Sequence, residues 1–313
     1  MNGPTFSVLV PAYNTEGTIA AALRSALAQT RRDFEIVVVD DGSTDGTAEA
    51  VRPFLEESRV KLVQQENRGL AGARNTALAH AHGPFVSLLD SDDLWLPDYL
   101  ERMGAALERD TQAAFAYGDA WVLDDETRRI RLKTAMADVR PPSVPPRHPR
   151  VLALELLRRN FVFVATTIRR AVLDEVGPFD ASLRSAEDYE LWLRIALAGH
   201  YAVRVDGQVA LYRLRPGQLS SNRVEMLRHL RRVFELVERN PRATDEVRAL
   251  ARARAELMDD SLAAISGKRP LSAVQYRARL ALGRLKRSLV RPPIWYERPP
   301  PEVAAAFPDL GAV

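Results

Sequence analysis

Short apolar runs alternate with amphipathic segments through the first 90 residues of the chain. The apolar runs, rich in Val and Ile, predict strands at Phe6–Val10, Phe34–Val39, Val60–Val63 and Phe85–Leu89. The segments between them predict helices at Gly17–Gln29, Thr44–Glu57 and Leu70–His82. Strands that are apolar throughout are typical of a parallel sheet that helices cover on both faces. The pattern therefore predicts an α/β fold with a parallel sheet that is buried between helices on both faces.

The pattern after residue 96 mixes helices and strands. It predicts helices at Pro97–Glu108, Val151–Arg159 and Glu187–Ala198. It predicts strands at Ala113–Leu123, Arg129–Leu132 and Phe161–Ile168, and a hairpin that joins Tyr201–Val205 to Gln208–Tyr212. Pro141–Pro149 is rich in Pro and predicts a loop, which we expect to be mobile and to lie beside an active site.

The C-terminal part is helical in pattern and rich in Arg from Asn222 onward, with breaks at Asn240-Pro241 and Gly267–Pro270. The last segment, Ile294–Val313, is rich in Pro and is expected to be extended. Nine Lys and Arg against one Glu give residues 268–298 a charge of +8, so the rest of the chain carries −5 of the net +3. The basic character is therefore confined to one segment.

This basic segment contains a predicted amphipathic helix, Tyr276–Val290, whose leucines fall on one arc. Such a helix can lie on an anionic membrane, so residues 268–298 predict a peripheral membrane contact. Packing of the same helix on the main domain is an equally good interpretation. Nucleic-acid binding is not expected, because after Tyr276 the segment has no interleaved aromatic residue before Trp295 and Tyr296.

Composition excludes several classes of site. The chain has no Cys, which rules out disulfides, thiolate metal sites and cysteine nucleophiles. It has five His, so a bound metal is expected among carboxylate oxygens. No apolar stretch is long enough to predict a transmembrane helix, and Met1–Phe6 does not resemble a secretory signal. We therefore expect a cytoplasmic protein, with membrane contact limited to the inner face.

Polar residues follow three of the predicted strands. Pro11-Ala12-Tyr13-Asn14 follows the first, Asp40-Asp41-Gly42-Ser43 the second, and Asp90-Ser91-Asp92-Asp93 the fourth. Ligands of open parallel sheets bind beyond the carboxyl ends of the strands. These residues are therefore expected to line one site.

Asp90 and Asp92 are candidate metal ligands. In an extended segment they point to the same side, and two close carboxylates repel each other unless a cation lies between them. Oxygen-only ligands suit Mg²⁺ or Mn²⁺, which also bind substrate phosphates. The alternative, that these acids only cap the next helix, is weakened by Pro97 at the expected helix start.

The loops after the first two strands suggest a nucleoside site. A carboxylate such as Asp40 can accept hydrogen bonds from a ribose or a base, and Tyr13 offers a ring for stacking. No G-x-G-x-x-G follows the first strand, which argues against a nicotinamide or flavin cofactor. The plainer interpretation is a strand–turn–helix with Ser43 or Thr44 as the helix cap. Arg74 lies among small residues and could reach a base or a diphosphate, although those residues also suit close helix packing.

Glu187 and Asp188 begin an amphipathic helix, where Asp188 could act as a general base. A capping box formed by Ser185 and Asp188 accounts for one of the two acids. Trp192 falls on the same helix face as Asp188 and could line a sugar-sized pocket, although a single Trp is more often part of a core.

These motifs together resemble the family 2 glycosyltransferases with the GT-A fold. The resemblance is carried by Ser7–Asn14, Val39–Asp45, Asn67-Arg68-Gly69 with Ala73-Arg74-Asn75, Leu89–Asp93 and Glu187-Asp188. It covers about Phe6 to Ser221 and implies a Rossmann-like mixed sheet, mostly parallel and flanked by helices. It implies a catalytic unit at residues 1–221, with a nucleotide-sugar half at about 1–95 and an acceptor half at about 96–221. Residues 222–313 would form a helical extension with a Pro-rich tail.

The resemblance also implies roles for individual residues. Pro11, Tyr13, Asp40 and Arg74 would hold the nucleoside, and Asp188 would take the acceptor proton. Asp90 would contact the ribose or the metal, and Asp92 would bind the divalent cation, Mg²⁺ or Mn²⁺. Further substrate contacts are expected from Asn14, Asp41, Gly42, Glu187, Trp192, Arg213 and Arg215. Many family members carry His where Arg215 stands; since Arg cannot bind a metal, it would neutralise the phosphates directly.

The implied reaction is an inverting transfer from a nucleotide-diphosphate sugar, with a UDP-sugar favoured, to an acceptor hydroxyl that can be lipid-linked. The products would be polysaccharides or other glycoconjugates. One alternative is a catalytically silent nucleotide-sugar-binding or scaffold protein of the same fold, which the replacement of His by Arg215 suggests. Another is an adaptor that acts through the basic segment.

Overall fold

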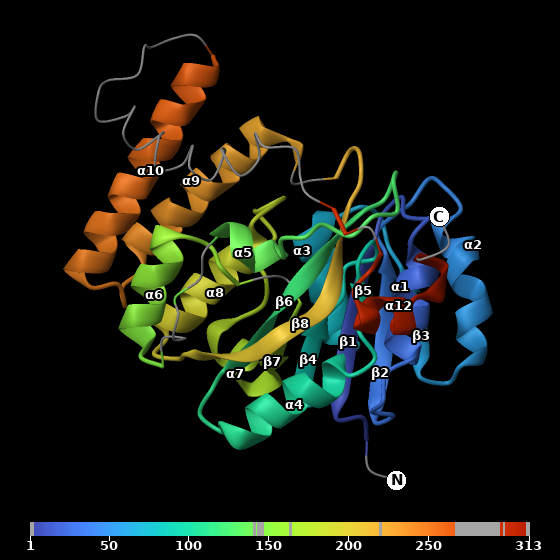
Figure 1. Ribbon diagram of the computed structural model, residues 1–313. Coiled ribbons are helices and arrows are strands. Elements are labelled where there is room, and N and C mark those ends of the chain that lie inside the picture. The colour runs from blue at the N-terminus through green and yellow to red at the C-terminus, as the bar shows by residue number, and fades with distance from the viewer. Residues whose placement is uncertain are drawn as a thin grey trace.

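One mixed sheet runs through the chain, with helices on both faces (Figure 1). The computed structural model describes residues 3–139, 142, 147–162, 165–218, 221–266, 295–296 and 298–310. The strand order is β3-β2-β1-β4-β7-β6-β8-β5. The strands are β1 (Phe6–Ala12), β2 (Phe34–Asp40), β3 (Val60–Gln64), β4 (Phe85–Leu88), β5 (Leu94–Trp95), β6 (Phe115–Asp124), β7 (Thr166–Arg169) and β8 (Ala202–Leu214).

The helices connect and cover these strands. They are α1 (Ile19–Leu27), α2 (Thr47–Val51), α3 (Gly69–Ala79), α4 (Tyr99–Arg109), α5 (Ala135–Val139), α6 (Pro149–Arg158), α7 (Arg170–Val176), α8 (Glu187–Leu197), α9 (Arg223–Arg239), α10 (Asp245–Ile265) and α12 (Pro301–Ala306). Among the described helices, none combines the length and apolarity needed to cross a bilayer.

The sheet is mostly parallel, as the apolar strands predict. β3, β2, β1 and β4 are parallel neighbours, and β6 is parallel to β8. β7 runs antiparallel between β4 and β6, and the short β5 runs antiparallel to β8. The predicted α/β class with a mixed, mostly parallel sheet is therefore confirmed.

Alternate residues of the central strands face two separate cores. Leu9 and Val37 pack into a core with α3, α6 and α8, whereas Val8 and Ile36 pack into a core with α1 and α4. Because side chains of a strand alternate between faces, a sheet covered on both sides buries both sets of side chains. This explains why every residue of β1 and β2 is buried.

The C-terminal helices lie on one side of the sheet. α9 and α10 form an antiparallel pair that packs against α6 and α8 (Figure 1), with the break between them where Asn240-Pro241 predicts it. Val233, Phe234 and Val247 are buried in the same core as α6 and α8. The pair is thus continuous with the sheet's core.

The predicted hairpin at residues 201–212 is wrong, because these residues form the single strand β8. Asp206 and Gly207 bulge out of the pairing with β6: Tyr117 pairs with Arg204, but Asp119 pairs with Gln208. Gly207 has a φ of +70°, which favours Gly. Arg102 holds the bulge by donating hydrogen bonds to the carbonyls of Asp206 and Gln208. Parallel pairing with β6 therefore overrides the local Asp-Gly turn signal.

Other elements differ from the prediction in extent. Arg129–Leu132 contributes two isolated bridges, from Ile130 to Leu123 and from Arg131 to Trp295, and the strand expected from Phe161 begins at Thr166. The helix after β2 changes to a 3-10 helix at Arg52, next to Pro53, which has no backbone N–H. Its cap is Gly46, not Ser43 or Thr44.

The Pro-rich tail is not wholly extended, because Pro301–Ala306 forms α12 and Pro308–Leu310 a 3-10 turn. Pro at the first helical position is compatible with a helix start, since that N–H has no helical partner. Val303 and Leu310 are buried against residues of β5, β6 and β8. In Figure 1, α12 lies beside α1. The predicted helix Tyr276–Val290 and most of Pro141–Pro149 lie outside the described residues.

Glu35 is a buried acid that ties strand β2 to its neighbours. Its carboxylate accepts hydrogen bonds from Ser7 Oγ at 2.8 Å, from the His82 backbone N–H at 2.6 Å and from Lys61 Nζ at 3.0 Å. Burial by itself raises the pKa of Glu35, but these donors together outweigh it and leave the pKa below the usual value. The ionised form is thus stabilised by folding.

We therefore expect Glu35→Gln to lower the free energy of unfolding by about 1–3 kcal/mol at neutral pH, because it weakens buried hydrogen bonds to a charged group. A depressed pKa contributes stability above the unfolded-state pKa and loses it as pH falls through the folded-state pKa. The difference in the free energy of unfolding between the variant and the wild type should therefore shrink below about pH 4.5. Urea unfolding across pH measures this, with the exposed Glu49→Gln as control; an equal loss in both variants would contradict it.

Candidate active site

The polar residues identified in the sequence gather beyond the carboxyl ends of β1, β2 and β4. In Figure 1, β1 rises from the N-terminus, so these strand ends lie at the top of the view. α8 begins nearby and β8 ends nearby, as the contacts below show. The sheet order, with β4 next to β1 and β7, makes this convergence possible.

Arg74 joins the site's acids from two distant segments. It lies in α3, its side chain is 1% exposed, and its guanidinium donates to Asp90 Oδ1 at 2.7 Å and to Glu187 Oε1. The guanidinium carbon of Arg74 also lies over the ring of Phe179, 5.5 Å from the ring centroid. Nearby Asp90 and Glu187 raise the pKa of Arg74 despite its burial, which keeps it charged. A buried cation therefore holds the start of α8 against the end of β4.

Asp188 lies next to this ion-pair cluster at the start of α8. Burial raises the pKa of Asp188; the charge of Arg74 opposes this, and that of Asp90 adds to it. Burial raises the pKa of Glu187 to about 7, although the charge of Arg74 acts to lower it. Hydrogen bonds join Arg74 to Asp90 and Glu187, and Asp188 directly follows Glu187 in the chain. A carboxylate with a raised pKa is suited to act as a base near neutral pH.

The start of α8 differs from the predicted capping box. Its cap residue is Ala186, in the left-handed region with a φ of +60°, and it makes no side-chain capping bond. Ser185 Oγ is buried without a hydrogen-bond partner, and Asp188 Oδ1 accepts from the N–H of Tyr189 at 2.7 Å. At this helix start Glu187 accepts from Arg74, whereas Asp188 accepts from the helix's own N–H at Tyr189. Local backbone strain such as that at Ala186 is typical of functional sites.

Asp92 and Asp93 meet two arginines from the end of β8. Asp92 Oδ2 accepts from Arg215 Nε at 2.7 Å, and the Asp92 carbonyl accepts from Arg213 Nε at 2.6 Å. Asp93 Oδ1 accepts from the Arg213 backbone N–H at 2.9 Å. Burial and then the charge of Asp90 raise the pKa of Asp92. Asp90 thus links this cluster to Arg74.

Sequence reasoning gave Asp93 no role of its own and missed Asp125. Asp93 is buried, and burial followed by the charges of Asp92 and Asp90 raises its pKa well above the usual value. Asp125 pairs with the guanidinium of Arg213, which is 4% exposed. The Asp90–Asp93 run was a signal for Asp93. The turn around Asp125 carried none, because its partner is 88 residues away.

The acids after β2 are mostly engaged with the neighbouring loop. Asp40 accepts from the Ser43 N–H at 3.0 Å and from Gln64 Nε2 at 3.2 Å. Asp41 Oδ1 accepts from the Arg68 N–H at 2.8 Å and from Gln65 Nε2. Asp41 therefore organises the turn between β3 and α3, at the edge of the site.

The loops after β1 and β2 hold each other in place. Asn14 has a φ of +52°, accepts from the Thr44 N–H at 2.8 Å and donates its own N–H to Ser43 Oγ at 3.0 Å. Gly42 has a φ of +74°, and a Cβ there would lie 2.9 Å from Asn67 N. Between these loops Pro11 is buried, while Tyr13 is 48% exposed. The ring of Tyr13 is therefore accessible for stacking.

Trp192 does not line an opening, contrary to the prediction. Its side chain is fully buried and stacks on Phe115, with ring centroids 4.7 Å apart. The helix places it on the core side, one turn after Asp188. Its predicted role in substrate contact is corrected to a role in packing.

Asp90 and Asp92 could hold a divalent cation together with ligands from a substrate. The described residues contain no group of three or more His, Asp or Glu that could bind an ion by themselves. The two carboxylates nevertheless repel each other, and their repulsion raises the pKa of Asp92. A divalent cation would relieve this repulsion, and it commonly completes its shell with water and phosphate oxygens. The donor set thus fits Mg²⁺ or Mn²⁺ held partly by a diphosphate.

A small opening of about 220 Å³ borders this cluster. Its lining includes Arg215, Gln218 and Ser221 from the segment after β8, and Asp124 and Glu126 from the turn after β6. Gln218 ties this segment down, since its Oε1 accepts from the Arg215 N–H at 3.1 Å. The segment that carries Arg215 therefore borders the acids.

Comparisons with known proteins agree with this geometry. Residues 7–177, more than half of the chain, match the family model described as Glycosyl transferase family 2. The chain is 33% identical over 226 residues to UDP-Glc:alpha-D-GlcNAc-diphosphoundecaprenol beta-1,3-glucosyltransferase WfgD of Escherichia coli, covering 71% of this chain and 82% of that protein. It is 29% identical to the putative teichuronic acid biosynthesis glycosyltransferase TuaG of Bacillus subtilis, covering 75% and 89%.

Solved structures show the same fold. The mannosyltransferase PcManGT from Pyrobaculum calidifontis, in complex with GDP-Man and Mn²⁺, is 26% identical with a TM-score of 0.62, covering 93% of this chain and 82% of that one. S. aureus TarS, residues 1–349, is 22% identical with a TM-score of 0.61, covering 91% and 81%. The second likeness concerns the fold alone.

Proposed function

The chain belongs to the family 2 glycosyl transferases, and from that premise we propose that the cluster around Arg74 is its catalytic centre. The chain is thus a nucleotide-sugar-dependent glycosyltransferase of a family whose members are generally inverting. The roles of individual residues are our proposal. The observation that carries it is the pair of hydrogen bonds from Arg74 to Asp90 and Glu187, which bring the start of α8 to the acids after β4.

In the proposed reaction Asp188 is the base. The acceptor hydroxyl attacks the anomeric carbon of the donor, its proton passes to the Asp188 carboxylate, and the bond from that carbon to the diphosphate oxygen breaks. One displacement from the opposite face inverts the anomeric centre. The electron pair leaves on the diphosphate, where positive charge is needed. Arg215 is placed to supply that charge, beside Asp92.

Asp90 and Asp92 are proposed to hold a divalent cation, which when bound would neutralise the leaving diphosphate as a Lewis acid. Arg74 orients Asp90 through its hydrogen bond, and Arg213 holds the loop by its bonds to Asp92 and Asp93. These residues orient the ligands and do not themselves react.

The nucleoside is proposed to lie between the loops after β1 and β2. Tyr13 would stack on the base, and Asp40 would accept a hydrogen bond at the base edge while it is held by Ser43 and Gln64. Asn14, Asp41 and Gly42 act through the loop shape.

The donor is proposed to be a UDP-sugar and the acceptor a hydroxyl of a lipid-linked sugar, because the relative WfgD is named for both. The division into a catalytic unit at residues 1–221 and an extension at 222–313 remains a proposal. So does a peripheral membrane contact through residues 268–298, most of which lie outside the described residues.

Replacing Arg215 tests how the chain handles the cation. We expect Arg215→Gln to strengthen Mn²⁺ binding to the donor-free chain by about tenfold, because Asp92 loses a competing charge-assisted hydrogen bond. Electron paramagnetic resonance of free Mn²⁺ measures the affinity, with Arg228→Gln on the exposed face of α9 as control. Unchanged Mn²⁺ affinity would show that Asp92 is not a metal ligand.

The Arg215–Asp92 pair also favours one second candidate, a chain that binds nucleotide sugars without catalysis. Thermal shift of the full chain with UDP, GDP and TDP, each with and without Mn²⁺, identifies the donor, since a ligand that binds the native state stabilises it. The matching sugar nucleotide is then incubated with a lipid-diphosphate sugar acceptor. Transfer supports the enzyme; stabilisation without transfer or hydrolysis supports the silent protein.

A further inference from the structure

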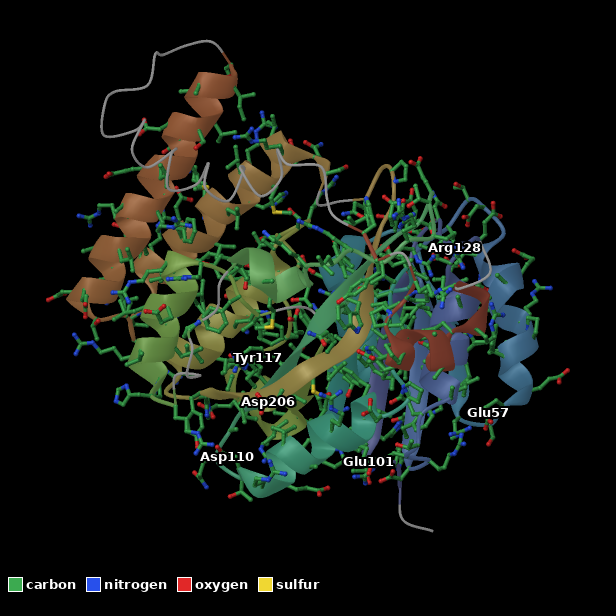
Figure 2. All side chains as sticks on the ribbon, in the orientation of Figure 1. Glu57, Glu101, Asp110, Tyr117, Arg128 and Asp206 are labelled. Carbon is green, nitrogen blue, oxygen red and sulfur yellow. The ribbon has the colours of Figure 1, made fainter. Side chains whose placement is uncertain are left out.

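A second pocket lies at the opposite end of the sheet from the proposed catalytic centre. It encloses about 940 Å³ between the end of α4, the start of β8 and Arg147. β8 is parallel to β6 and β1, so its start lies at the edge where the parallel strands begin. Figure 2 labels Asp110 and Asp206 in this region, well below the strand ends that carry the site. The volume is near the upper end of ligand pockets, which span about 300–1,000 Å³.

Positive charge dominates the lining of this pocket. Arg102, Arg109, Arg147 and Arg204 line it, against Asp110 and Asp206. The carboxylate of Asp206 is 97% exposed, so water screens its charge strongly. The apolar remainder of the wall comes mainly from Ala105, Ala106, Val203 and Val205.

Three of these arginines have no carboxylate within hydrogen-bond distance among the described residues. Arg204 and Arg147 lie 3.8 Å from the nearest acid oxygens, those of Asp206 and Asp110, which is too far for a hydrogen bond. Arg109 makes no ion pair or side-chain hydrogen bond within the described residues. By contrast, the Arg31–Asp33 and Arg194–Glu190 pairs are 2.6 and 2.8 Å apart.

The fourth arginine is committed to structure. Arg102 donates to the carbonyls of Asp206 and Gln208 and so fixes the β8 bulge that forms one wall. Asp110 is likewise held, because its Oδ1 accepts from Tyr201 OH at 2.8 Å. The pocket thus has a fixed frame and guanidinium groups whose donors are free for an oxyanion.

We propose that this pocket binds a phosphate-bearing anion through Arg109, Arg147 and Arg204, separately from the donor site. Guanidinium groups present paired donors that match phosphate oxygens, and charge-assisted bonds of this kind are stronger than neutral ones. The anion can be a soluble phosphate compound or the headgroup of an acidic lipid, since the recognising chemistry is the same.

The test uses the full chain with Arg109→Gln and Arg204→Gln combined. Calorimetry with inorganic pyrophosphate, in EDTA so that no metal supports the donor site, should show binding to the wild type and about tenfold weaker binding to the double variant. Arg52→Gln with Arg242→Gln removes the same charge from exposed sites elsewhere and should bind as the wild type does. UDP affinity with Mn²⁺ should be the same in all three proteins.

A second experiment measures how much of the wild type and of each variant sediments with phosphatidylglycerol vesicles and with phosphatidylcholine vesicles. Loss of pyrophosphate binding in the Arg109/Arg204 variant supports a soluble ligand. Loss of phosphatidylglycerol binding alone, with no pyrophosphate binding by the wild type, supports a lipid headgroup. The proposal is overturned if neither probe binds the wild type, if the pocket variant binds like its charge-matched control, or if Arg215→Gln and not the pocket variant loses the pyrophosphate.

Discussion

Replacing Asp188 by Asn is expected to lower kcat for sugar transfer by about 10²–10⁴-fold, the range of a general base, while the chain stays folded. The amide keeps the acceptor oxygen that receives the Tyr189 N–H, so the start of α8 should be preserved. It cannot take a proton from the acceptor hydroxyl. Donor affinity should change little, because Asp188 acts on the acceptor.

The pH profile gives this prediction a second readout. The base must be ionised to act, and burial raises the pKa of Asp188. The acid limb of kcat in the wild type should therefore lie at higher pH than the ordinary Asp pKa of about 4. Asp174→Asn, at an exposed position of α7, is the control. If Asp188→Asn keeps wild-type kcat, the assignment of the base is wrong.

Replacing Arg74 by Met is expected to lower the free energy of unfolding by about 3–5 kcal/mol, because it leaves two acids near each other without their buried cation. Glu187 is 2% exposed and cannot regain water easily. Guanidinium unfolding of the wild type and the variant measures the loss. Arg52→Met, at an exposed ion pair, should change stability by no more than about 0.5 kcal/mol.

A double variant and the pH dependence separate this mechanism from simple loss of packing. Glu187→Gln in the Arg74→Met background should recover part of the lost stability, since one unpaired charge disappears. Glu187, with a pKa of about 7 beside Arg74, binds protons more tightly folded than unfolded, so it lowers stability as pH rises from about 4.5 to 7. Without Arg74 the pKa of Glu187 rises further. The decrease in the free energy of unfolding caused by Arg74→Met should therefore be larger at about pH 8, where Glu187 has to ionise, than at about pH 5. A loss independent of pH and of Glu187 would indicate packing alone.

The strand pattern predicted the N-terminal half of the sheet, where the local sequence determines the elements. β1 and β2 are apolar at nearly every position, and such runs have few alternatives to a buried parallel strand. β8 shows the limit: Asp206-Gly207 is locally a good turn, but the pairing of its flanks with β6 keeps the strand continuous. The Pro-rich tail shows the same limit of local sequence, because α12 depends on burial of Val303 against distant strands.

The acids of the site could be found from their place after strands, but their pairing could not. Arg74 meets Glu187 across 113 residues, and Arg215 meets Asp92 across 123. The sequence suggested that Arg74 faces the substrate, whereas its guanidinium is used to hold two acids. Trp192 had the right helical spacing for the site, yet the angle of α8 turns it into the core. Such orientations depend on packing between distant elements.

The central claim is that Asp188 and Asp92 face one donor site. Anomalous diffraction from crystals of the full chain soaked with UDP and Mn²⁺ tests it most directly. The account predicts a manganese peak within about 2.5 Å of both an Asp92 carboxylate oxygen and a diphosphate oxygen, with the Asp188 carboxylate facing the same opening. A nucleotide bound elsewhere, with no manganese at Asp92 or with Asp188 turned away from the diphosphate, would contradict it.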